Sequence, residues 1–355
     1  MVQNVHGTFI SEKINKVRWR PDPFNQSHSF LTGSWDNDQN NIKLWNFEQG
    51  EDDTDIYPFI VQNYPFEGDV TEAKFIDADH CVVSSSLGSV HYLKIANTLI
   101  GDVEITKEKC WSNIHRCKNN EPVLCSSFTV YEHDIVTIGE DGSINLLNVE
   151  RDNVLRRIEE ADSCSLNCVS FVKHSDILTG NSRGQMKIWD LRSKENKPSN
   201  SFMLSGDQIA ATCLAYHPNQ RHMVVAGDEE GSLTVWDLRQ NAFPVNLLSA
   251  HSESVSEIQF HPDHPDQMFS CSSSGELWHW ITNKPGPHGG KLLNVSEKET
   301  NTWLSTESIK DKFEVFMLMP KLHKPINSID LSRNRVLCGC DNEAIYLIDN
   351  VNIYS

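Results

Sequence analysis

The chain has 355 residues, of which 38% are hydrophobic and 23% are charged, so it carries enough apolar side chains to bury a core. Lys and Arg total 31 against 49 Asp and Glu, which gives a formal net charge of −18. Binding to phosphate backbones or anionic lipid surfaces relies on clustered cations, so this balance argues against direct nucleic-acid binding and against membrane surfaces.

The lack of long apolar runs and the ten cysteines together predict a protein of a reducing compartment that does not insert into membranes. Residues 1–25 lack the apolar run of a secretory signal, and no run of about 18 apolar residues occurs, so we expect no membrane insertion. Ten cysteines in a chain without an export signal are typical of reduced thiols in the cytosol or the nucleus.

Short runs of alternating apolar and polar residues recur along the chain and divide it into seven units. The first run of each unit closes on a large apolar residue: Trp19, Phe75, Phe128, Phe171, Tyr216, Phe260 and Leu331. A later run follows a turn and ends at Trp45, Leu93, Leu147, Trp189, Trp236, Trp280 and Ile348. The three middle intervals of the first series, 43, 45 and 44 residues, match the ~40–45-residue period of four-stranded propeller blades. Alternation with frequent turns predicts strands rather than helices.

The two ends of the chain are predicted to meet in one sheet. Residues 7–11 precede the first strand of unit one. At the other end, residues 344–350 have the position of a third strand, and no fourth run follows them. The N-terminal run can therefore supply the missing strand, which would close the ring and remove an open sheet edge.

The first stretch that lengthens the period is residues 97–122, which we predict to be an insertion. Potential metal ligands lie in or beside it: Cys110, His115, Cys117 and Cys125. Structural zinc sites usually show a closely spaced cysteine pair, which is missing here, so we expect ordinary thiols and no metal.

Residues 180–192 and 227–239 both end on Trp-Asp-Leu-Arg. The Trp-Asp pair resembles the signature of WD40 repeats, in which the indole fills space between blades and the Asp caps polar groups at the strand end. The positions that we assign to this signature are Trp45, Trp189, Asp190, Trp236, Asp237 and Trp280. No unit retains the family's whole set of His, Ser/Thr, Asp and Trp, so apolar packing between blades is expected to carry more of the stability.

These patterns together predict an all-β fold. It is a seven-bladed WD40 β-propeller, closed by pairing of the N-terminal strand with the last blade, and it forms a single domain over residues 1–355. We expect a monomeric propeller within a hetero-oligomer.

The second stretch that lengthens the period is residues 282–311, which begin rich in Pro and Gly and then carry Trp303. Loops on a rigid scaffold often carry function, and an exposed Trp is a plausible anchor, so Trp303 is a candidate partner contact. Packing of this indole back onto its own blade is the alternative.

Motifs of catalysis are missing from the sequence. It has no Gly-x-Ser-x-Gly elbow, no P-loop and no His-Glu-x-x-His. The stretch at 285–291 lacks the hydroxyl residue after its Lys, which favours a flexible loop. His217 and His261 each precede a Pro after a first strand, and no nucleophile or acid recurs beside them. We therefore expect a protein that is not an enzyme and needs no cofactor.

Several stretches carry a closer resemblance, and they are residues 13–24, 32–45, 136–146, 158–171, 274–280, 303–315 and 338–347. They resemble the small WD-repeat nucleoporins of the Y-shaped outer-ring complex of the nuclear pore. The resemblance implies a non-catalytic scaffold subunit that docks on α-solenoid nucleoporins in the short arm of the Y. It also implies location at the nuclear pore complex of the nuclear envelope, a kinetochore pool in mitosis, and support of pore assembly, nucleocytoplasmic transport and chromosome segregation.

A competing interpretation comes from the residue that follows each Trp-Asp-Leu. Arg192 and Arg239, in consecutive units, resemble the WDxR boxes of substrate receptors for cullin-based ubiquitin ligases, in which this Arg faces the adaptor. Both arginines are therefore candidate partner contacts. Such tetrapeptides also arise in WD40 proteins without a ligase role.

Overall fold

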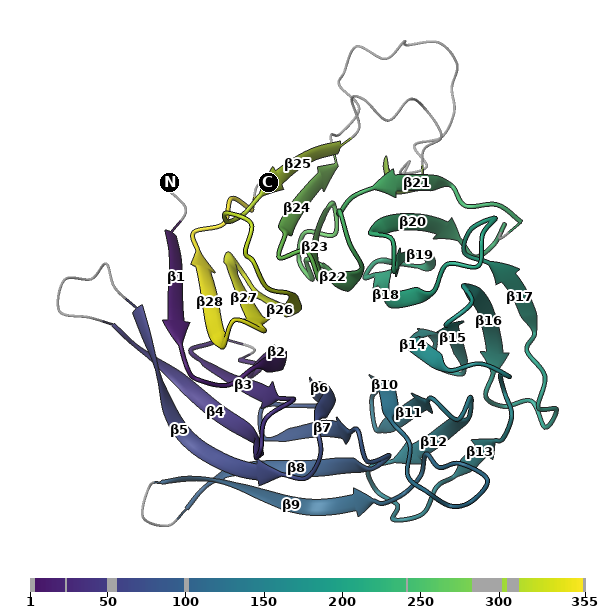
Figure 1. Ribbon diagram of the computed structural model, residues 1–355, viewed down its shortest axis with the longest axis horizontal. Coiled ribbons are helices and arrows are strands. Elements are labelled where there is room, and N and C mark those ends of the chain that lie inside the picture. The colour runs from purple at the N-terminus through teal and green to yellow at the C-terminus, as the bar shows by residue number, and fades with distance from the viewer. Residues whose placement is uncertain are drawn as a thin grey trace, which may run out of the picture.

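The structure, a computed structural model, describes residues 4–22, 24–49, 56–98, 102–240, 242–282, 302–304 and 313–353. Within these residues, strands β1 to β28 form seven four-stranded antiparallel sheets arranged around a central channel (Figure 1). The predicted seven-bladed β-propeller is therefore confirmed. Blade one comprises β2–β5 and each later blade the next four strands, except that blade seven combines β26–β28 with β1.

The strands occupy four concentric positions. The innermost strands are β2 (Ile14–Trp19), β6 (Val70–Phe75), β10 (Cys125–Tyr131), β14 (Leu166–Lys173), β18 (Ala211–His217), β22 (Val255–Phe260) and β26 (Ile326–Ser332). The second strands are β3 (Ser29–Ser34), β7 (His80–Ser85), β11 (Asp134–Gly139), β15 (Asp176–Asn181), β19 (Gln220–Asp228), β23 (Gln267–Ser272) and β27 (Arg335–Cys340).

The third and fourth strands complete each blade. The third strands are β4 (Asn40–Gln49), β8 (Val90–Asn97), β12 (Ile144–Asn148), β16 (Gln185–Asp190), β20 (Ser232–Asp237), β24 (Leu277–Thr282) and β28 (Ala344–Asp349). The outermost strands are β5 (Ile56–Phe66), β9 (Val103–Trp111), β13 (Arg156–Ile158), β17 (Asn200–Met203), β21 (Asn246–Ser249), β25 (Phe313–Met317) and β1 (Asn4–Phe9). One turn of 3-10 helix, η1 (Thr302–Leu304), precedes β25.

The hydrophobic core consists of seven separate clusters, one between each pair of neighbouring blades. The second strands are buried on both faces, as β23 shows, since every one of its residues is buried. A single blade cannot bury these two faces alone, and stacking of adjacent blades removes both from water. Each blade therefore depends on its two neighbours.

The ring closes as predicted, because β1 pairs with β28 in an antiparallel register from Asn4↔Asp349 to Phe9↔Ala344. The closing strand begins three residues before the predicted run at 7–11 and ends before Ile10. Figure 1 shows β1 and β28 side by side at the rim, with both chain ends on the same side of the ring. The closure leaves β28 without a free edge.

Residues 97–122 belong in part to the regular structure of blade two, and the insertion predicted for the rest stays a prediction. They contain β9, which pairs with β8 as the fourth strand of blade two. The interval between the first strands of blades two and three is lengthened by β8 and β9, which are long strands, as are β4 and β5 in blade one. Spacing alone cannot distinguish a longer hairpin from an insertion. Most of the second predicted insertion, 282–311, lies outside the described residues, and the single-domain boundary of 1–355 stays a prediction.

Removal of β1 tests the closure. A chain lacking residues 1–9 leaves β28 with an open edge and loses the six residue pairs of this ladder. Because a backbone hydrogen bond contributes about 1 kcal/mol net, we expect the free energy of unfolding to fall by roughly 3 kcal/mol or more. The open edge should also promote self-association.

Guanidinium titration and size-exclusion chromatography with light scattering measure the two effects. Phe9→Ser is the control, because it keeps the strand and removes only a ring that is 67% exposed. A truncated chain that is monomeric and as stable as the control would contradict the closing role of β1.

Candidate functional site

The four tryptophans of the WD signature are buried on third strands, each between its own blade and the preceding one. Three of them donate their indole N–H to a hydroxyl on the neighbouring second strand. These bonds are Trp45 to Thr32 (2.9 Å), Trp189 to Thr179 (3.1 Å) and Trp280 to Ser270 (2.9 Å). The four indoles therefore lie between blades, and the structural role that the family resemblance implied for them stays a prediction.

Blade five departs from this arrangement. The register places Ala226 where the other three blades have Thr or Ser. Consequently the indole N–H of Trp236, buried at 2% exposure, has no hydrogen-bond partner among the described residues. A buried unpaired donor is costly, so the packing of Trp236 against Phe202, at 4.5 Å between ring centroids, must outweigh this cost.

Blade six builds a complete polar network from a changed set of residues. Ser270 Oγ accepts from Trp280 and is joined to His251 Nε2 at 2.8 Å. His251 Nδ1 lies 3.4 Å from Glu276, which stands two residues after the turn position of the usual Asp. Burial lowers the pKa of His251 to about 4, although Glu276 acts in the opposite direction. The sequence pattern missed this network because its carboxylate has moved along the chain.

Blade three holds the other polar set. His115 joins Asp141 at 2.9 Å and Thr137 at 2.8 Å, while Leu147 fills the tryptophan position. Burial raises the pKa of Asp141, but hydrogen bonds from His115 and Ser143 outweigh burial and bring the pKa to about 2. The same bonds hold His115 away from any metal-binding role. Among the described residues, no group of three or more His, Cys, Asp or Glu could hold a metal ion.

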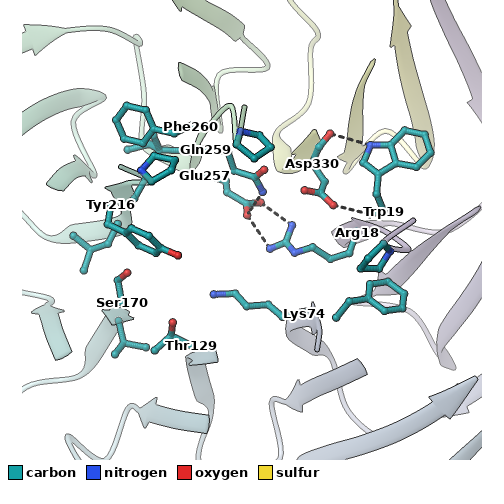
Figure 2. A pocket seen from close by; sticks show the side chains of 18 residues that line it. Arg18, Trp19, Lys74, Thr129, Ser170, Tyr216, Glu257, Gln259, Phe260 and Asp330 are labelled. Atoms are coloured by element: carbon teal, nitrogen blue, oxygen red, sulfur yellow. Dashed lines mark hydrogen bonds and ion pairs between the residues drawn. The ribbon is translucent and has the colours of Figure 1, made fainter. Parts of the chain in front are cut away.

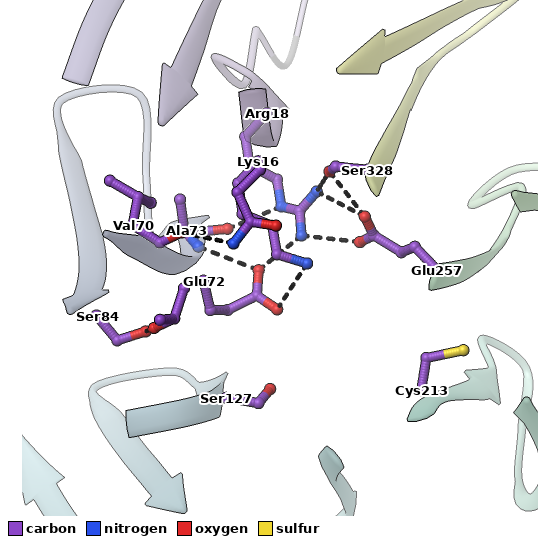
Figure 3. A network of polar contacts seen from close by, with 12 residues as sticks. Lys16, Arg18, Val70, Glu72, Ala73, Ser84, Ser127, Cys213, Glu257 and Ser328 are labelled. Atoms are coloured by element: carbon purple, nitrogen blue, oxygen red, sulfur yellow. Dashed lines mark hydrogen bonds and ion pairs between the residues drawn. The ribbon is translucent and has the colours of Figure 1, made fainter. Parts of the chain in front are cut away.

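Arg18 on β2 is the centre of an ion network that crosses the channel wall (Figure 3). Its guanidinium donates to Glu72 of blade two at 2.6 Å and to Glu257 of blade six at 2.8 Å. It also donates to Ser328 of blade seven at 2.9 Å, so one side chain connects four blades. Burial lowers the pKa of Arg18, but these carboxylates raise it well above its ordinary value, so the guanidinium stays charged.

Asp330 is a third carboxylate beside this network. It accepts the backbone N–H of Trp19 at 2.6 Å and that of Leu331 at 3.0 Å. Burial raises the pKa of Asp330 to about 6, against the opposing effect of Arg18. The carboxyl group therefore titrates near neutral pH, unlike Glu72, whose pKa lies at about 2 because Lys16 and Arg18 outweigh burial.

The channel contains a cavity of about 520 Å³ (Figure 2). The innermost strands of all seven blades contribute to its wall, together with Pro21, Pro218 and Pro262. Its polar side chains include Arg18, Lys74, Tyr216 and Glu257. This volume is in the range of small-ligand sites, so the channel is a candidate ligand site.

A second surface lies on the rim where blades seven and one meet. Its members are apolar side chains of the outermost strands β1 and β5, each between 42% and 67% exposed: Val5, Phe9, Tyr57, Phe59 and Ile60. The beginning of β5 approaches β1 at the rim (Figure 1), and neither strand carries Asp, Glu, Lys or Arg. We call these five residues the closure surface. Exposed apolar side chains gathered on neighbouring strands are a candidate protein interaction site.

Comparison with known proteins identifies the family. The model of the nucleolar protein 10-like N-terminal domain, a β-propeller, matches residues 80–306. The chain is 35% identical to nucleoporin Nup43 of Homo sapiens and 34% identical to nucleoporin Nup43 of Mus musculus, each over 98% of both chains. The chain belongs to the Nup43 family of nucleoporins. Nuclear pore complex protein nup43 of Dictyostelium discoideum is 24% identical over 96% of this chain and 97% of that protein.

The candidate partner contact at Trp303 is buried in this Nup43-family propeller, at 1% exposure. Its indole donates to the carbonyl of Pro265 at 3.2 Å and packs against Phe260 and Phe313. Trp303 therefore packs onto the blades, which was the alternative, and in this conformation it offers no exposed anchor. Trp111 is likewise buried, at 3% exposure.

The two arginines of the WDxR boxes are 75% and 62% exposed, but each folds back on the Asp of its own Trp-Asp pair. Asp190 accepts the backbone N–H of Arg192 at 2.9 Å and its guanidinium at 3.1 Å. Asp237 does the same for Arg239 at 3.0 and 2.9 Å. The Asp side chains thus cap the strand ends, and the use of these arginines by a Nup43-family protein in partner binding stays a prediction.

The sequence predicts no membrane insertion for this Nup43-family chain. In the described ranges, no helix reaches the length and apolar character that crossing a membrane requires.

Two substitutions at the second-strand position whose hydroxyl accepts the indole N–H of the WD tryptophan should change stability in opposite directions. Ser270→Ala leaves Trp280 Nε1 and His251 Nε2 unpaired, and we expect it to cost about 2–4 kcal/mol, since each unpaired buried group costs about 1–3 kcal/mol. Ala226→Ser offers Trp236 Nε1 an acceptor and should stabilise by about 1 kcal/mol. Urea unfolding measures both, and a Ser270→Ala change within about 0.5 kcal/mol of zero would refute the network.

Asp330 gives a pH-dependent prediction. Its folded-state pKa of about 6 lies above the ordinary 3.8, so its stabilising contribution is complete below pH 3.8 and is lost as the pH rises through 6. Asp330→Asn keeps an acceptor for Trp19 without the buried charge. The free energy of unfolding of Asp330→Asn should exceed that of the wild type by about 1–3 kcal/mol at pH 8, and the difference should vanish near pH 4.

Denaturant titrations at several pH values between 4 and 8 measure this difference. A variant that is no more stable than the wild type at pH 8 would show that Asp330 is not strained by its buried charge.

Proposed function

We propose that this chain is a non-catalytic scaffold subunit of the outer-ring Y complex of the nuclear pore, docked on α-solenoid nucleoporins of the short arm. The observation that carries the proposal is that similarity to Nup43 nucleoporins spans 98% of both chains. A match to WD repeats in general is shorter, as with WD repeat-containing protein 55 of Mus musculus, which aligns with 44% of this chain. The whole propeller is thus related to nucleoporins, and not its repeats alone.

The same relationship supports a location and a set of roles. In the proposal, the chain resides at the nuclear pore complex between divisions and has a kinetochore pool in mitosis. It contributes to pore assembly, to transport of protein and mRNA, and to chromosome segregation.

The polar groups of the channel support a structural role over a catalytic one. Glu72 and Glu257 bind Arg18, and Asp330 binds two backbone N–H groups, so each buried carboxylate holds blades together. A general base needs to reach a substrate proton, which these committed carboxylates do not offer. Rigidity, which these contacts supply, is what a scaffold requires.

The closure surface is the docking surface that we propose for the α-solenoid partner. Its five residues are apolar, and one exposed acidic residue, Glu48, lies opposite Tyr57 in the ladder of β4 and β5. The complementary surface is an apolar helix face with basic residues at its margins. Buried aromatic side chains dominate such interfaces, so Tyr57 and Phe59 are the expected hot spots.

Affinity purification of the tagged chain from interphase nuclei tests the proposal. We expect outer-ring nucleoporins in near-equal amounts with the chain, and at least a tenfold loss of recovery for the double variant Tyr57→Ser, Phe59→Ser. Phe243→Ser is the matched control, because Phe243 is 80% exposed on blade five and lies outside the closure surface.

The two parts of the proposal fail separately. If the wild type recovers no nucleoporin, the scaffold role is wrong. If the double variant recovers as much as the Phe243→Ser control, the scaffold role stands and the closure surface is not the docking site.

A further inference from the structure

The channel cavity holds four polar groups that no part of the described chain satisfies. They are the ammonium of Lys74 and the hydroxyls of Thr129, Ser170 and Tyr216, which all line the cavity. Figure 2 shows the four side chains projecting into the same space from four different blades. Thr129 and Ser170 are each only 5% exposed, so they are fixed parts of the wall.

Lys74 is the most informative member. Its ammonium lies 5.9 Å from the centre of the Phe128 ring and forms no hydrogen bond or ion pair within the described residues. Burial lowers the pKa of Lys74, in spite of Glu72 and Glu257, which raise it. Lys74 is partly buried, lines the cavity and has no direct counter-ion in the described chain, so its ammonium is placed to receive an anion from outside.

The carboxylates of the wall are already committed elsewhere. Glu257 accepts from Arg18, from the Ser328 hydroxyl at 2.7 Å and from the Ile329 N–H at 3.1 Å. Asp330 is bound by Trp19 and Leu331. Turning either toward Lys74 would break bonds that connect blades, so an anionic ligand is what would give Lys74 a counter-ion in direct contact.

The chemistry of the four groups selects the kind of anion. One ammonium supplies a single positive charge, which balances one carboxylate but not a phosphate monoester of about −1.5 to −2, and the three hydroxyls can donate to the carboxylate oxygens. The single wall guanidinium, Arg18, is already committed to two carboxylates. The rest of the wall is largely apolar and includes Trp19, Phe75 and Phe260. The cavity therefore suits a carboxylate on an aliphatic stem.

We propose that the channel binds a glutamate side chain presented by an acidic peptide segment of another protein. Lys74 would pair with the carboxylate, the three hydroxyls would donate to it, and the apolar wall would contact its stem and the flanking residues. This site is separate from the closure surface and does not depend on the scaffold role.

Fluorescence anisotropy tests the proposal with a labelled peptide Gly-Leu-Glu-Leu-Gly and its Gln analogue, which has the same shape without the charge. We expect saturable binding of the Glu peptide, at least tenfold weaker binding of the Gln peptide, and a loss of at least tenfold with Lys74→Met. Lys118→Met is the control and should bind as the wild type does, because Lys118 is 92% exposed on a loop.

Two further measurements keep the test decisive. Tyr216→Phe removes one hydroxyl from a side chain that is 43% exposed, and a several-fold weakening is expected even if Lys74→Met fails to fold. The single amino acid derivative N-acetylglutamate α-amide distinguishes the source of the carboxylate: competition only at concentrations far above those of the peptide supports a peptide ligand.

The contrary results are equally clear. No saturable binding of the Glu peptide, equal binding of the Gln peptide, or unchanged binding by Lys74→Met would each overturn the proposal. Binding of the amide derivative as tightly as the peptide would assign the site to a free small carboxylate and overturn the peptide ligand.

Discussion

Apolar packing between neighbouring blades is the interaction on which the rest of the structure depends. Each of the seven core clusters contains residues of two neighbouring blades, so a single blade has no complete hydrophobic core. The ring is therefore stable only when every interface between blades is formed. β1 completes blade seven by pairing with β28. Arg18 then connects blades one, two, six and seven by hydrogen bonds. The channel site and the closure surface both exist because this ring is closed.

The sequence predicted the parts of the fold that repeat. Trp189 and Trp236 end alternating runs at blade spacing, and the run at 344–350 lacked a partner, so the blade number and the closing strand followed from pattern. The sequence did not predict β9, because a lengthened hairpin and an insertion change the period alike. It also gave no sign of which face of the ring carries function.

The ion network and the channel site could not be predicted, and the reason is distance along the chain. Arg18 and Glu257 are 239 residues apart and belong to no local motif, so only the circular arrangement brings them to 2.8 Å. Glu276 escaped notice because the carboxylate of blade six moved by two positions while keeping its place near His251. A repeat pattern predicts only the residues that the blades have in common. Lys74, Asp330 and Ala226 lie at positions where their blades differ from the others, so the pattern does not predict their roles.

The pairing of β1 with β28 has a consequence for biosynthesis. The first strand made by the ribosome has to wait for a partner that ends at Asp349, so the last interface cannot form until nearly the whole chain has emerged. Local hairpins can form early, but contacts of such long sequence separation are slow to form and leave sheet edges exposed meanwhile. Until then, the partly made propeller is an open arc whose terminal blades expose unpaired sheet edges, which favour aggregation.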